Sequence, residues 1–483
     1  MIALVALAAA LDATPVVLRP RSAEAHAARY VRLRLDVTSM GIAGRGEIVV
    51  DRTTGAFVRR FDAGPASERD GWDGTTVWHA DATAMPRVEG NPDERAAVVT
   101  WARLFAPVAG ASPPPASRAP DVTTDRAHDE TVVVLHVGAW TERVTFAGSR
   151  AEDNFAAPAT ITDTSENGVW TARVTGVETP RTVPAATFEP PAPPDDATLH
   201  GVTTIPIGGD GAYPIVEVAL DGGPPMRFVL DTGGQNAITV QAARRAHLQP
   251  VGTATVSGVG AALAPAAFTT VRTMRIGTAE LRDQPFFVLD LGDAPIDGII
   301  GYEVLARFAA RIDLVHLRVQ LARDARDLEP GGVAVRMSLD DRQPQVDGAL
   351  DGIPGTMTID TGSAGSVDVE SPFVAAHDLR ARMHAVAGGT ASGVGGAVHG
   401  AVARAKELRL GSVVVPSPLV FLTDERAGGY ADPTIAANIG NQVLRRFALV
   451  LDYRNATIRF EPAAGGRIGN GATATHSPSA APT

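Results

Sequence analysis

Two aspartates in the chain stand in the same short motif, and as a pair they could catalyse a hydrolysis. Asp231 and Asp360 each begin an Asp-Thr-Gly tripeptide directly after an apolar segment. Hydrolysing a peptide bond without a metal ion or a covalent intermediate needs one carboxylate to take a proton from water and a second carboxylic acid to protonate or polarise the carbonyl. Two carboxyl groups about 3 Å apart cannot both ionise, so such a pair shares one proton. The motif therefore predicts general acid–base chemistry if the two aspartates face each other.

The glycine of each tripeptide suits this chemistry. Gly233 and Gly362 let the backbone turn tightly and bring peptide N–H groups close to the carboxylates, where a Cβ atom would obstruct them. A single Asp-Thr-Gly is also a common way to end a strand, because Asp and Gly both favour turns. The alternative interpretation of each aspartate is therefore a structural turn residue, and the rest of the chain has to distinguish the two.

An internal repeat makes that distinction. Six short segments recur in the same order, at offsets between 129 and 139 residues. The first pair is Leu-Asp-Gly at 220–222 and 350–352, and the last is an apolar-Asp pair at 312–313 and 451–452. Six ordered matches predict two similar β-rich lobes produced by gene duplication, with one Asp-Thr-Gly in each lobe.

With this repeat, the sequence resembles the aspartic proteases of the retropepsin-like and pepsin-like superfamily. The resemblance covers about residues 200–462 and rests on both Asp-Thr-Gly motifs and on an apolar-apolar-Gly segment after each. Those segments are Ile299-Ile300-Gly301 and, with Asn438 in the first apolar place, Asn438-Ile439-Gly440. The resemblance implies a bilobal pair of β-barrels in which Asp231 and Asp360 are catalytic. Because one chain carries both aspartates, the resemblance also implies that a monomer holds a complete site. The reaction needs no cofactor.

The resemblance assigns roles to the neighbours of the two aspartates as well. Thr232 and Thr361 would cross-link the lobes through hydroxyl-to-backbone hydrogen bonds, although β-branched residues also occur simply as strand-end residues. Ser363 matches the position whose hydroxyl bonds the outer oxygen of its aspartate. Gly234 stands at the corresponding place after Asp231 and cannot make that bond, so the pair is expected to be asymmetric.

Two glycine-rich segments match the flaps of this superfamily, which are hairpins that close over an extended peptide. They are Ser257-Gly258-Val259-Gly260 and Ser392-Gly393-Val394-Gly395. The alternative is a pair of plain hairpin turns, and neither segment supplies the third glycine of a nucleotide-binding Gly-x-Gly-x-x-Gly. The flap tyrosine of pepsin-type enzymes is not evident in either segment, which favours the retropepsin-like side of the superfamily.

Residues 22–189 precede the repeat and are expected to form a β-rich domain with one helix. Alternating apolar and polar residues predict strands at 30–37, 131–137 and 169–177, and a helix is expected at 93–105. Residues 71–78 weakly resemble a motif of periplasmic lipoprotein-carrier-like β domains. The five tryptophans all lie in this region, where they would form its core or, alternatively, a binding platform: Trp72, Trp78, Trp101, Trp140 and Trp170.

Composition suggests the remaining boundaries. Residues 1–21 include an unbroken apolar run and are expected to be a signal or leader segment that exports the protein to the periplasm or beyond; a folded strand is the alternative. No apolar run reaches the roughly 18 residues of a membrane helix. A proline cluster predicts a linker at 190–199 between independently folding parts. The two lobes would then span 200–330 and 331–463, before a disordered tail at 464–483.

Several classes of function are excluded by composition. The 483 residues include no cysteine, which rules out disulfides, thiolate metal sites and thiol nucleophiles. A net charge of −11 leaves no basic face for nucleic acid. Lys406 is the only lysine, so neither a phosphate-binding Gly-Lys-Ser/Thr loop nor a Schiff-base lysine is present. The histidines show no metal-binding spacing, so no metal site is expected.

The sequence as a whole predicts an aspartic-type endopeptidase. A water molecule activated by Asp231 and Asp360 would hydrolyse an extended peptide or unfolded protein bound across the interlobe cleft, with edge-strand pairing to hold the main chain. A second hypothesis is an inactive pseudo-protease that binds peptides in the same cleft. A third makes the N-terminal domain a carrier of lipid or lipopeptide, with the protease appended to it.

Overall fold

The computed structural model describes residues 17–105, 118, 120–137, 140–152, 154–165, 168–209, 212–292, 295–340, 342–463 and 469–470. The fold is mainly β, which confirms the predicted fold class. Most of the expected leader segment (1–21) and of the expected tail (464–483) lies outside the described residues. Among the helices described, none has the length and apolar character needed to cross a membrane.

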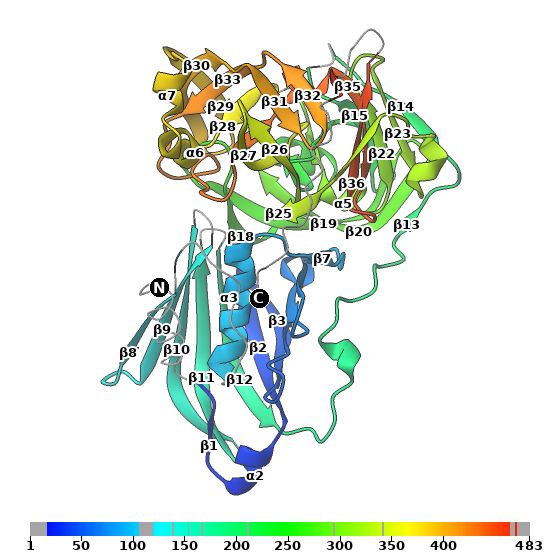
Figure 1. Ribbon diagram of the computed structural model, residues 1–483. Helices are drawn as coiled ribbons and strands as arrows, with labels where there is room; N and C mark the ends of the chain where they lie inside the picture. The colour runs from blue at the N-terminus through cyan, green and yellow to red at the C-terminus, as the bar shows by residue number, and fades with distance from the viewer. Residues whose placement is uncertain are drawn as a thin grey trace, which may run out of the picture.

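The N-terminal part is a curved sheet of twelve strands around one long helix (Figure 1). Its main path has the order β7-β6-β5-β4-β3-β2-β12-β11-β10-β9-β8, and β1 pairs with β11. The predicted strands at 30–37, 131–137 and 169–177 are confirmed as β2, β9 and β12. The strands are β1 (Arg19–Pro20), β2 (Tyr30–Ser39), β3 (Ile42–Asp51), β4 (Phe57–Asp62), β5 (Glu68–Trp72), β6 (Val77–Ala80), β7 (Arg87–Val88), β8 (Asp121–Asp125), β9 (Glu130–Val137), β10 (Trp140–Glu152), β11 (Phe155–Ser165) and β12 (Gly168–Glu178).

The long helix is α3 (Pro92–Phe105), at the expected place. Asn91 caps it, because its Oδ1 accepts the backbone N–H of Asp93 at 2.8 Å. Its apolar face carries Trp101, which stacks on Trp170 of the sheet with ring centroids 5.9 Å apart. Four of the five tryptophans are buried, as a core role predicts, whereas Trp140 is half-buried. Shorter helices of this part are α2 (Ala23–Ala27), η1 (Gly64–Ala66) and η2 (Ala185–Thr187).

The C-terminal part contains two sheets in which corresponding strands follow the same order. The first sheet includes the run β20-β17-β21-β16-β15, and the second includes β33-β28-β34-β27-β26. The strands of the first sheet are β13 (Ala197–Thr198), β15 (Ile215–Leu220), β16 (Met226–Leu230), β17 (Ala237–Thr239), β18 (Val251–Val256), β19 (Ala264–Ile276), β20 (Ala279–Leu289) and β21 (Gly298–Ile300). Those of the second are β25 (Ser338–Asp340), β26 (Gln343–Leu350), β27 (Ile353–Ile359), β28 (Val367–Val369), β29 (Val386–Gly393), β30 (Gly396–Arg404), β31 (Glu407–Leu410), β32 (Val413–Pro416), β33 (Leu419–Thr423), β34 (Ala437–Ile439) and β37 (Gly469–Asn470).

A third sheet joins the two lobes. It has six strands in the order β14-β23-β22-β35-β36-β24, and its central antiparallel pair joins β22 to β35. One hydrophobic cluster extends through both lobes and includes Phe228 and Phe460. The strands are β14 (Thr203–Pro206), β22 (Ala309–Asp313), β23 (Arg318–Ala322), β24 (Val333–Arg336), β35 (Phe447–Asp452) and β36 (Thr457–Pro462). The helices of the C-terminal part are α4 (Val240–Arg245), α5 (Tyr302–Leu305), η3 (Ala325–Leu328), α6 (Ser371–Ala376), α7 (Leu379–Arg382) and α8 (Asn441–Leu444).

The N-terminal part packs directly against the C-terminal lobes (Figure 1). Arg307 of the first lobe is 4% exposed, and its Nη2 donates to the carbonyl oxygen of Thr83 at 3.0 Å. Arg342 of the second lobe donates from Nε to Oδ2 of Asp81 at 2.8 Å. Met85 packs in one apolar cluster with Tyr302 of α5 and with Ala306, which directly follows that helix. The expected linker at 190–199 is therefore accompanied by a direct interface between the parts it connects.

Candidate active site

Asp231 and Asp360 each follow the last residue of a strand, β16 in the first lobe and β27 in the second. Each strand pairs in parallel with the apolar-apolar-Gly segment of its lobe, and this pairing fixes the aspartate backbone. The N–H of Asp231 donates to the carbonyl oxygen of Ile300 at 2.9 Å, and that of Asp360 donates to Ile439 at 3.0 Å. Both aspartates therefore lie at equivalent strand ends.

The two carboxyl groups lie next to each other at the junction of the lobes. A Cβ atom at Gly233 would lie 2.8 Å from Oδ1 of Asp360, and one at Gly362 would overlap the carboxyl group of Asp231. Each glycine thus passes close to the aspartate of the opposite lobe, and its missing side chain leaves room for that carboxylate. The fold brings together the two aspartates that the sequence singled out.

Thr232 and Thr361 bind the two strand ends to each other through four reciprocal hydrogen bonds. The N–H of Thr232 donates to Oγ1 of Thr361 at 3.0 Å, and the N–H of Thr361 donates to Oγ1 of Thr232 at 2.9 Å. Each hydroxyl then donates across the junction, Thr232 to the carbonyl oxygen of Ile359 at 2.6 Å and Thr361 to that of Leu230 at 2.7 Å. Both threonines are 0% exposed, so the links are shielded from water and hold the aspartates in register.

The two carboxylates accept similar hydrogen bonds at Oδ1, the inner oxygen. They differ at Oδ2, the outer oxygen. Oδ1 of Asp231 accepts the N–H of Gly233 at 2.7 Å, and Oδ1 of Asp360 accepts that of Gly362 at 2.8 Å. Oδ2 of Asp360 also accepts an N–H from the Asn438 amide at 2.7 Å. Burial, together with the neighbouring charge of Asp360, raises the pKa of Asp231 well above its usual value.

Asn438 is a site residue that the sequence analysis did not assign. It lies on β34, opposite Thr358 in the parallel pair with β27, and so beside the strand that leads to Asp360. In the first lobe, Ile299 occupies the same register position opposite Val229. The available signal was a polar residue in the first place of an apolar-apolar-Gly segment, where burial disfavours an amide unless it has a partner.

Ser363 makes a different contact from the one expected. Its hydroxyl donates to Oδ2 of Asp368 at 3.4 Å and accepts the N–H of Gly365 at 3.0 Å, whereas Asn438 takes the outer oxygen of Asp360. Burial raises the pKa of Asp368 to about 6. Gly234, at the equivalent place in the first lobe, leaves space that the carboxylate needs, since a Cβ there would lie 2.7 Å from Oδ2 of Asp231.

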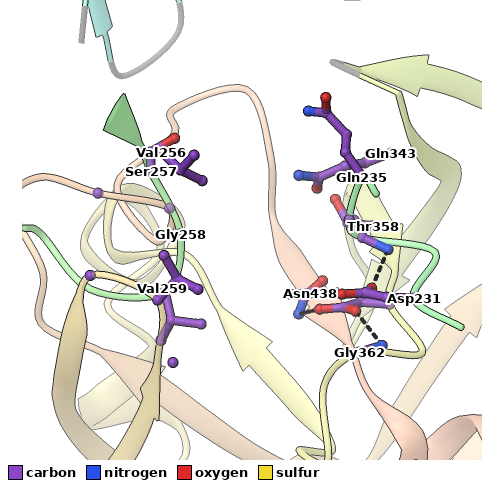
Figure 2. A pocket seen from close by; sticks show the side chains of 18 of the residues that line it. Asp231, Gln235, Val256, Ser257, Gly258, Val259, Gln343, Thr358, Gly362 and Asn438 are labelled. Carbon is purple, nitrogen blue, oxygen red and sulfur yellow. Dashed lines mark hydrogen bonds between the residues drawn. The ribbon is translucent and has the colours of Figure 1, made fainter. Parts of the chain in front are cut away.

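Both expected flap segments lie at hairpin connections and face the aspartates. Residues 257–260 follow β18 in its connection to β19, and residues 392–395 span the end of β29 and the turn that leads to β30. Their tips meet, because the N–H of Gly260 donates to the carbonyl oxygen of Val394 at 3.0 Å. Figure 2 shows Val256, Ser257, Gly258 and Val259 across an open space from Asp231 and Asn438.

The space between the flaps and the aspartates belongs to a cavity of about 1930 Å³ that also reaches the N-terminal domain. Its walls include Asp231, Asp360 and seven of the eight expected flap residues. Residues of the N-terminal sheet complete it, among them Arg59, Trp140 and Trp170. The guanidinium of Arg59 lies 5.2 Å from the centre of the Trp170 ring, in cation–π contact. The N-terminal domain therefore forms part of the wall of the cavity that contains Asp231 and Asp360.

Comparison with known proteins agrees with this geometry. Residues 216–304 match the family model described as aspartyl protease. The matched segment begins within β15, ends within α5, and contains Asp231 and the first flap segment but not Asp360. A search of the curated proteins gives no match. The match supports an aspartic protease family and, with it, aspartic-type peptidase activity.

Proposed function

We propose that this protein is an aspartic-type endopeptidase in which Asp231 and Asp360 form the catalytic dyad. The observation that carries the proposal is the set of four reciprocal hydrogen bonds between Thr232 and Thr361, which hold the two aspartates side by side at equivalent strand ends. The common strand order of the two lobes supports the internal repeat that the sequence predicts. The match to the aspartyl protease model independently supports the first half of the site.

The asymmetry of the dyad assigns the roles. A hydrogen bond to an ionised carboxylate stabilises the ion, so the Asn438 amide favours the negative charge on Asp360. Asp231 is buried and beside that charge, and its raised pKa favours the protonated form. Asp360 is therefore the general base and Asp231 the general acid in the resting enzyme.

With these roles, each proton transferred in the first half of the hydrolysis is returned in the second half. A water molecule between the carboxyl groups gives a proton to Asp360 while its oxygen attacks the carbonyl carbon, and Asp231 protonates the carbonyl oxygen. In the second half, Asp360 gives its proton to the leaving nitrogen as the C–N bond breaks. Asp231 recovers a proton from a hydroxyl of the tetrahedral intermediate, and the dyad returns to its starting state.

The flap strands suit an extended peptide substrate. Within the described residues, β18 and β29 are the outermost strands of their sheets. The N–H of Thr253 in β18 already donates to the carbonyl oxygen of Met40 at 2.8 Å, so β29 offers the more open edge for main-chain hydrogen bonds. A substrate that lies between the flaps and the dyad would pair with such edges as an added strand. An unfolded segment meets this requirement, whereas a folded helix satisfies its own backbone groups and does not.

A cleavage assay with an unfolded protein tests this proposal. Purified protein would be incubated with a carboxymethylated, unfolded substrate between pH 3 and 7, with and without a peptide that carries a hydroxyl group in place of the scissile carbonyl. We expect cleavage in the acid range that this transition-state mimic blocks. Peptide binding without turnover across that range would overturn the proposal and support the pseudo-protease.

A further inference from the structure

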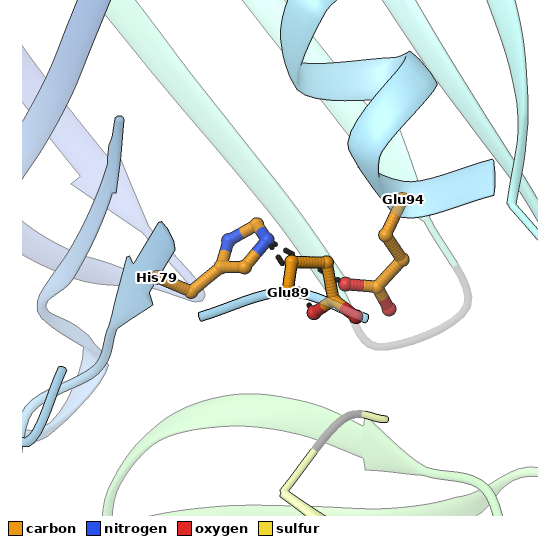
Figure 3. A group of neighbouring side chains, drawn as sticks. All are labelled: His79, Glu89 and Glu94. Carbon is orange, nitrogen blue, oxygen red and sulfur yellow. Dashed lines mark ion pairs between the residues drawn. The ribbon is translucent and has the colours of Figure 1, made fainter. Parts of the chain in front are cut away.

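A second group of polar side chains lies in the N-terminal domain, away from the dyad. His79 on β6, Glu89 directly after β7 and Glu94 in the first turn of α3 point toward one another (Figure 3). Nε2 of His79 lies 3.7 Å from Oε2 of Glu89 and 3.6 Å from Oε2 of Glu94. One ligand atom from each of the three residues lies within 4.8 Å of the other two.

Of the two carboxylate oxygens of Glu89, one accepts a hydrogen bond and the other accepts none from the described residues. Its side chain is 0% exposed, and Oε1 accepts the N–H of Asn91 at 2.7 Å. Oε2 makes no hydrogen bond to any residue that the structure describes, although it is fully buried. A buried carboxylate oxygen without a donor is costly, so this atom points to a ligand that supplies positive charge.

His79 shows the same division between its two ring nitrogens. Nδ1 lies 2.6 Å from Oδ1 of Asp70, while Nε2 has no hydrogen-bond partner within the described part of the chain. The residue is 9% exposed. Arg59 fixes Asp70 in turn, through bonds of 2.9 and 2.7 Å to Oδ2. A histidine whose Nδ1–H is held by a carboxylate presents the lone pair of Nε2, which is how metal-binding histidines are oriented.

We propose that His79 Nε2, Glu89 Oε2 and a carboxylate oxygen of Glu94 bind one divalent transition-metal ion, of which Zn²⁺ is the best fit. An imidazole nitrogen with two carboxylates suits Zn²⁺ and disfavours Mg²⁺ and Ca²⁺, which prefer oxygen ligands alone. Tetrahedral Zn²⁺ with bonds of about 2.0 to 2.2 Å holds its ligand atoms roughly 3.3 to 3.5 Å apart. The two distances from His79, 3.7 and 3.6 Å, are slightly longer, so the carboxylates would move closer to His79 when the ion binds.

The surroundings of the site limit its affinity for a cation and suggest what a bound ion would do. Arg87, whose positive charge acts on Glu89, stands opposite His79 in the β6–β7 pair and weakens the attraction for a second cation. Asn91, which binds Oε1 of Glu89, also donates from Nδ2 to Oδ1 of Asp340 in the second lobe at 3.0 Å. A bound ion would therefore brace β6 and α3 where the N-terminal domain meets the protease lobes.

The site also faces the large cavity, because His79 and Glu94 both line it. Three protein ligands leave a fourth position for water or for an anionic group of a molecule in that cavity. No metal was expected, because the histidines show no metal-binding spacing. His79, Glu89 and Glu94 lie ten and then five residues apart in the sequence. That spacing matches no single-helix or single-hairpin motif, and only the folded sheet brings the ligands together. The inference is independent of the proposed peptidase activity.

Zinc binding by the full-length protein tests the proposal. Protein stripped with a chelator and then freed of it would be titrated with Zn²⁺ by isothermal titration calorimetry, in the presence and absence of millimolar Mg²⁺. We expect one Zn²⁺ per chain, at an affinity that Mg²⁺ leaves unchanged, and a higher unfolding temperature with Zn²⁺ bound. Absence of stoichiometric Zn²⁺ binding by the wild type would overturn the proposal.

Three variants test the assigned site: one changes a proposed ligand, one changes the residue that orients His79, and one is a control. Glu94→Gln keeps the size of a side chain that is 21% exposed, so it should fold normally and bind Zn²⁺ at least tenfold more weakly. Asp70→Asn should weaken binding by about 10- to 100-fold through the orientation of His79. Glu217→Gln, on the exposed face of β15, is the matched control and should bind like the wild type. Unchanged affinity in folded Glu94→Gln, or an equal loss in Glu217→Gln, would contradict the assigned ligands.

Discussion

The Asn438 amide donates a hydrogen bond to Oδ2 of Asp360 at 2.7 Å, and at the equivalent register position of the first lobe the apolar side chain of Ile299 has nothing to donate. Two lobes with the same strand order thus give their aspartates different outer environments. The difference lowers the cost of a charge on Asp360 relative to Asp231. This difference is the basis on which we assign the shared proton to Asp231 in the proposed mechanism.

Replacing Asn438 by Leu should shift the acid limb of the pH–rate profile toward higher pH. The hydrogen bond stabilises the ionised carboxylate of Asp360, and a leucine side chain offers no donor to replace it. Activity that needs the ionised base is then lost at a higher pH than in the wild type. A charge-assisted hydrogen bond contributes about 1.5 kcal/mol, which corresponds to a shift of about 1 pH unit.

The measurement is kcat/KM against pH for both proteins. Ile299→Leu changes the same register position in the other lobe without removing a donor, so its acid limb should coincide with that of the wild type. An unshifted acid limb in Asn438→Leu would contradict the assignment of the base to Asp360.

Gly234→Ala should reduce turnover far more than Ser363→Ala, although the two residues hold equivalent places. A Cβ at Gly234 would lie 2.7 Å from Oδ2 of Asp231, so the carboxyl group has to move. A displacement of this kind can cost about 100-fold in kcat/KM. Ser363 already carries a Cβ, and its hydroxyl contacts Asp368 rather than Asp360, so its loss should cost less than about threefold. Steady-state kinetics would give kcat/KM for both variants. Equal losses would contradict the inference that the carboxyl group of Asp231 needs the space at Gly234.

Thr232→Val should destabilise the fold, while Thr232→Ser should largely preserve it. Valine keeps the shape but leaves the N–H of Thr361 and the carbonyl oxygen of Ile359 without their partner in a fully buried place. Each unsatisfied buried group costs about 1 to 3 kcal/mol. Urea unfolding at equilibrium measures the difference. A Val variant as stable as the Ser variant would show that the hydroxyl does not hold the lobes together.

Much of the dyad could be predicted from local sequence. An apolar strand followed by Asp-Thr-Gly specifies where Asp231 and Asp360 leave the sheet, because the strand period and the glycine turn are encoded by adjacent residues. The strands at 30–37, 131–137 and 169–177 were found for the same reason. Helix α3 was also predictable, since its periodic apolar face and acidic first turn lie in one continuous segment.

The contacts between distant segments could not be predicted in this way. Asn438 is 78 residues from Asp360, and Arg307 is 224 residues from Thr83, so neither contact follows from sequence spacing. The shared cavity likewise exists only because the N-terminal sheet packs on the lobes.

The central claim is that Asp231 and Asp360 act as one catalytic unit, and turnover by their Asn variants tests it most directly. Cleavage of an unfolded substrate would be measured for the wild type, Asp231→Asn, Asp360→Asn and the double variant, with peptide binding followed in parallel by fluorescence anisotropy. Each single variant should lose turnover by at least about a thousandfold while still binding peptide, and the double variant should be little worse than either, because the two carboxyl groups share one step. Full activity in either single variant would contradict the account.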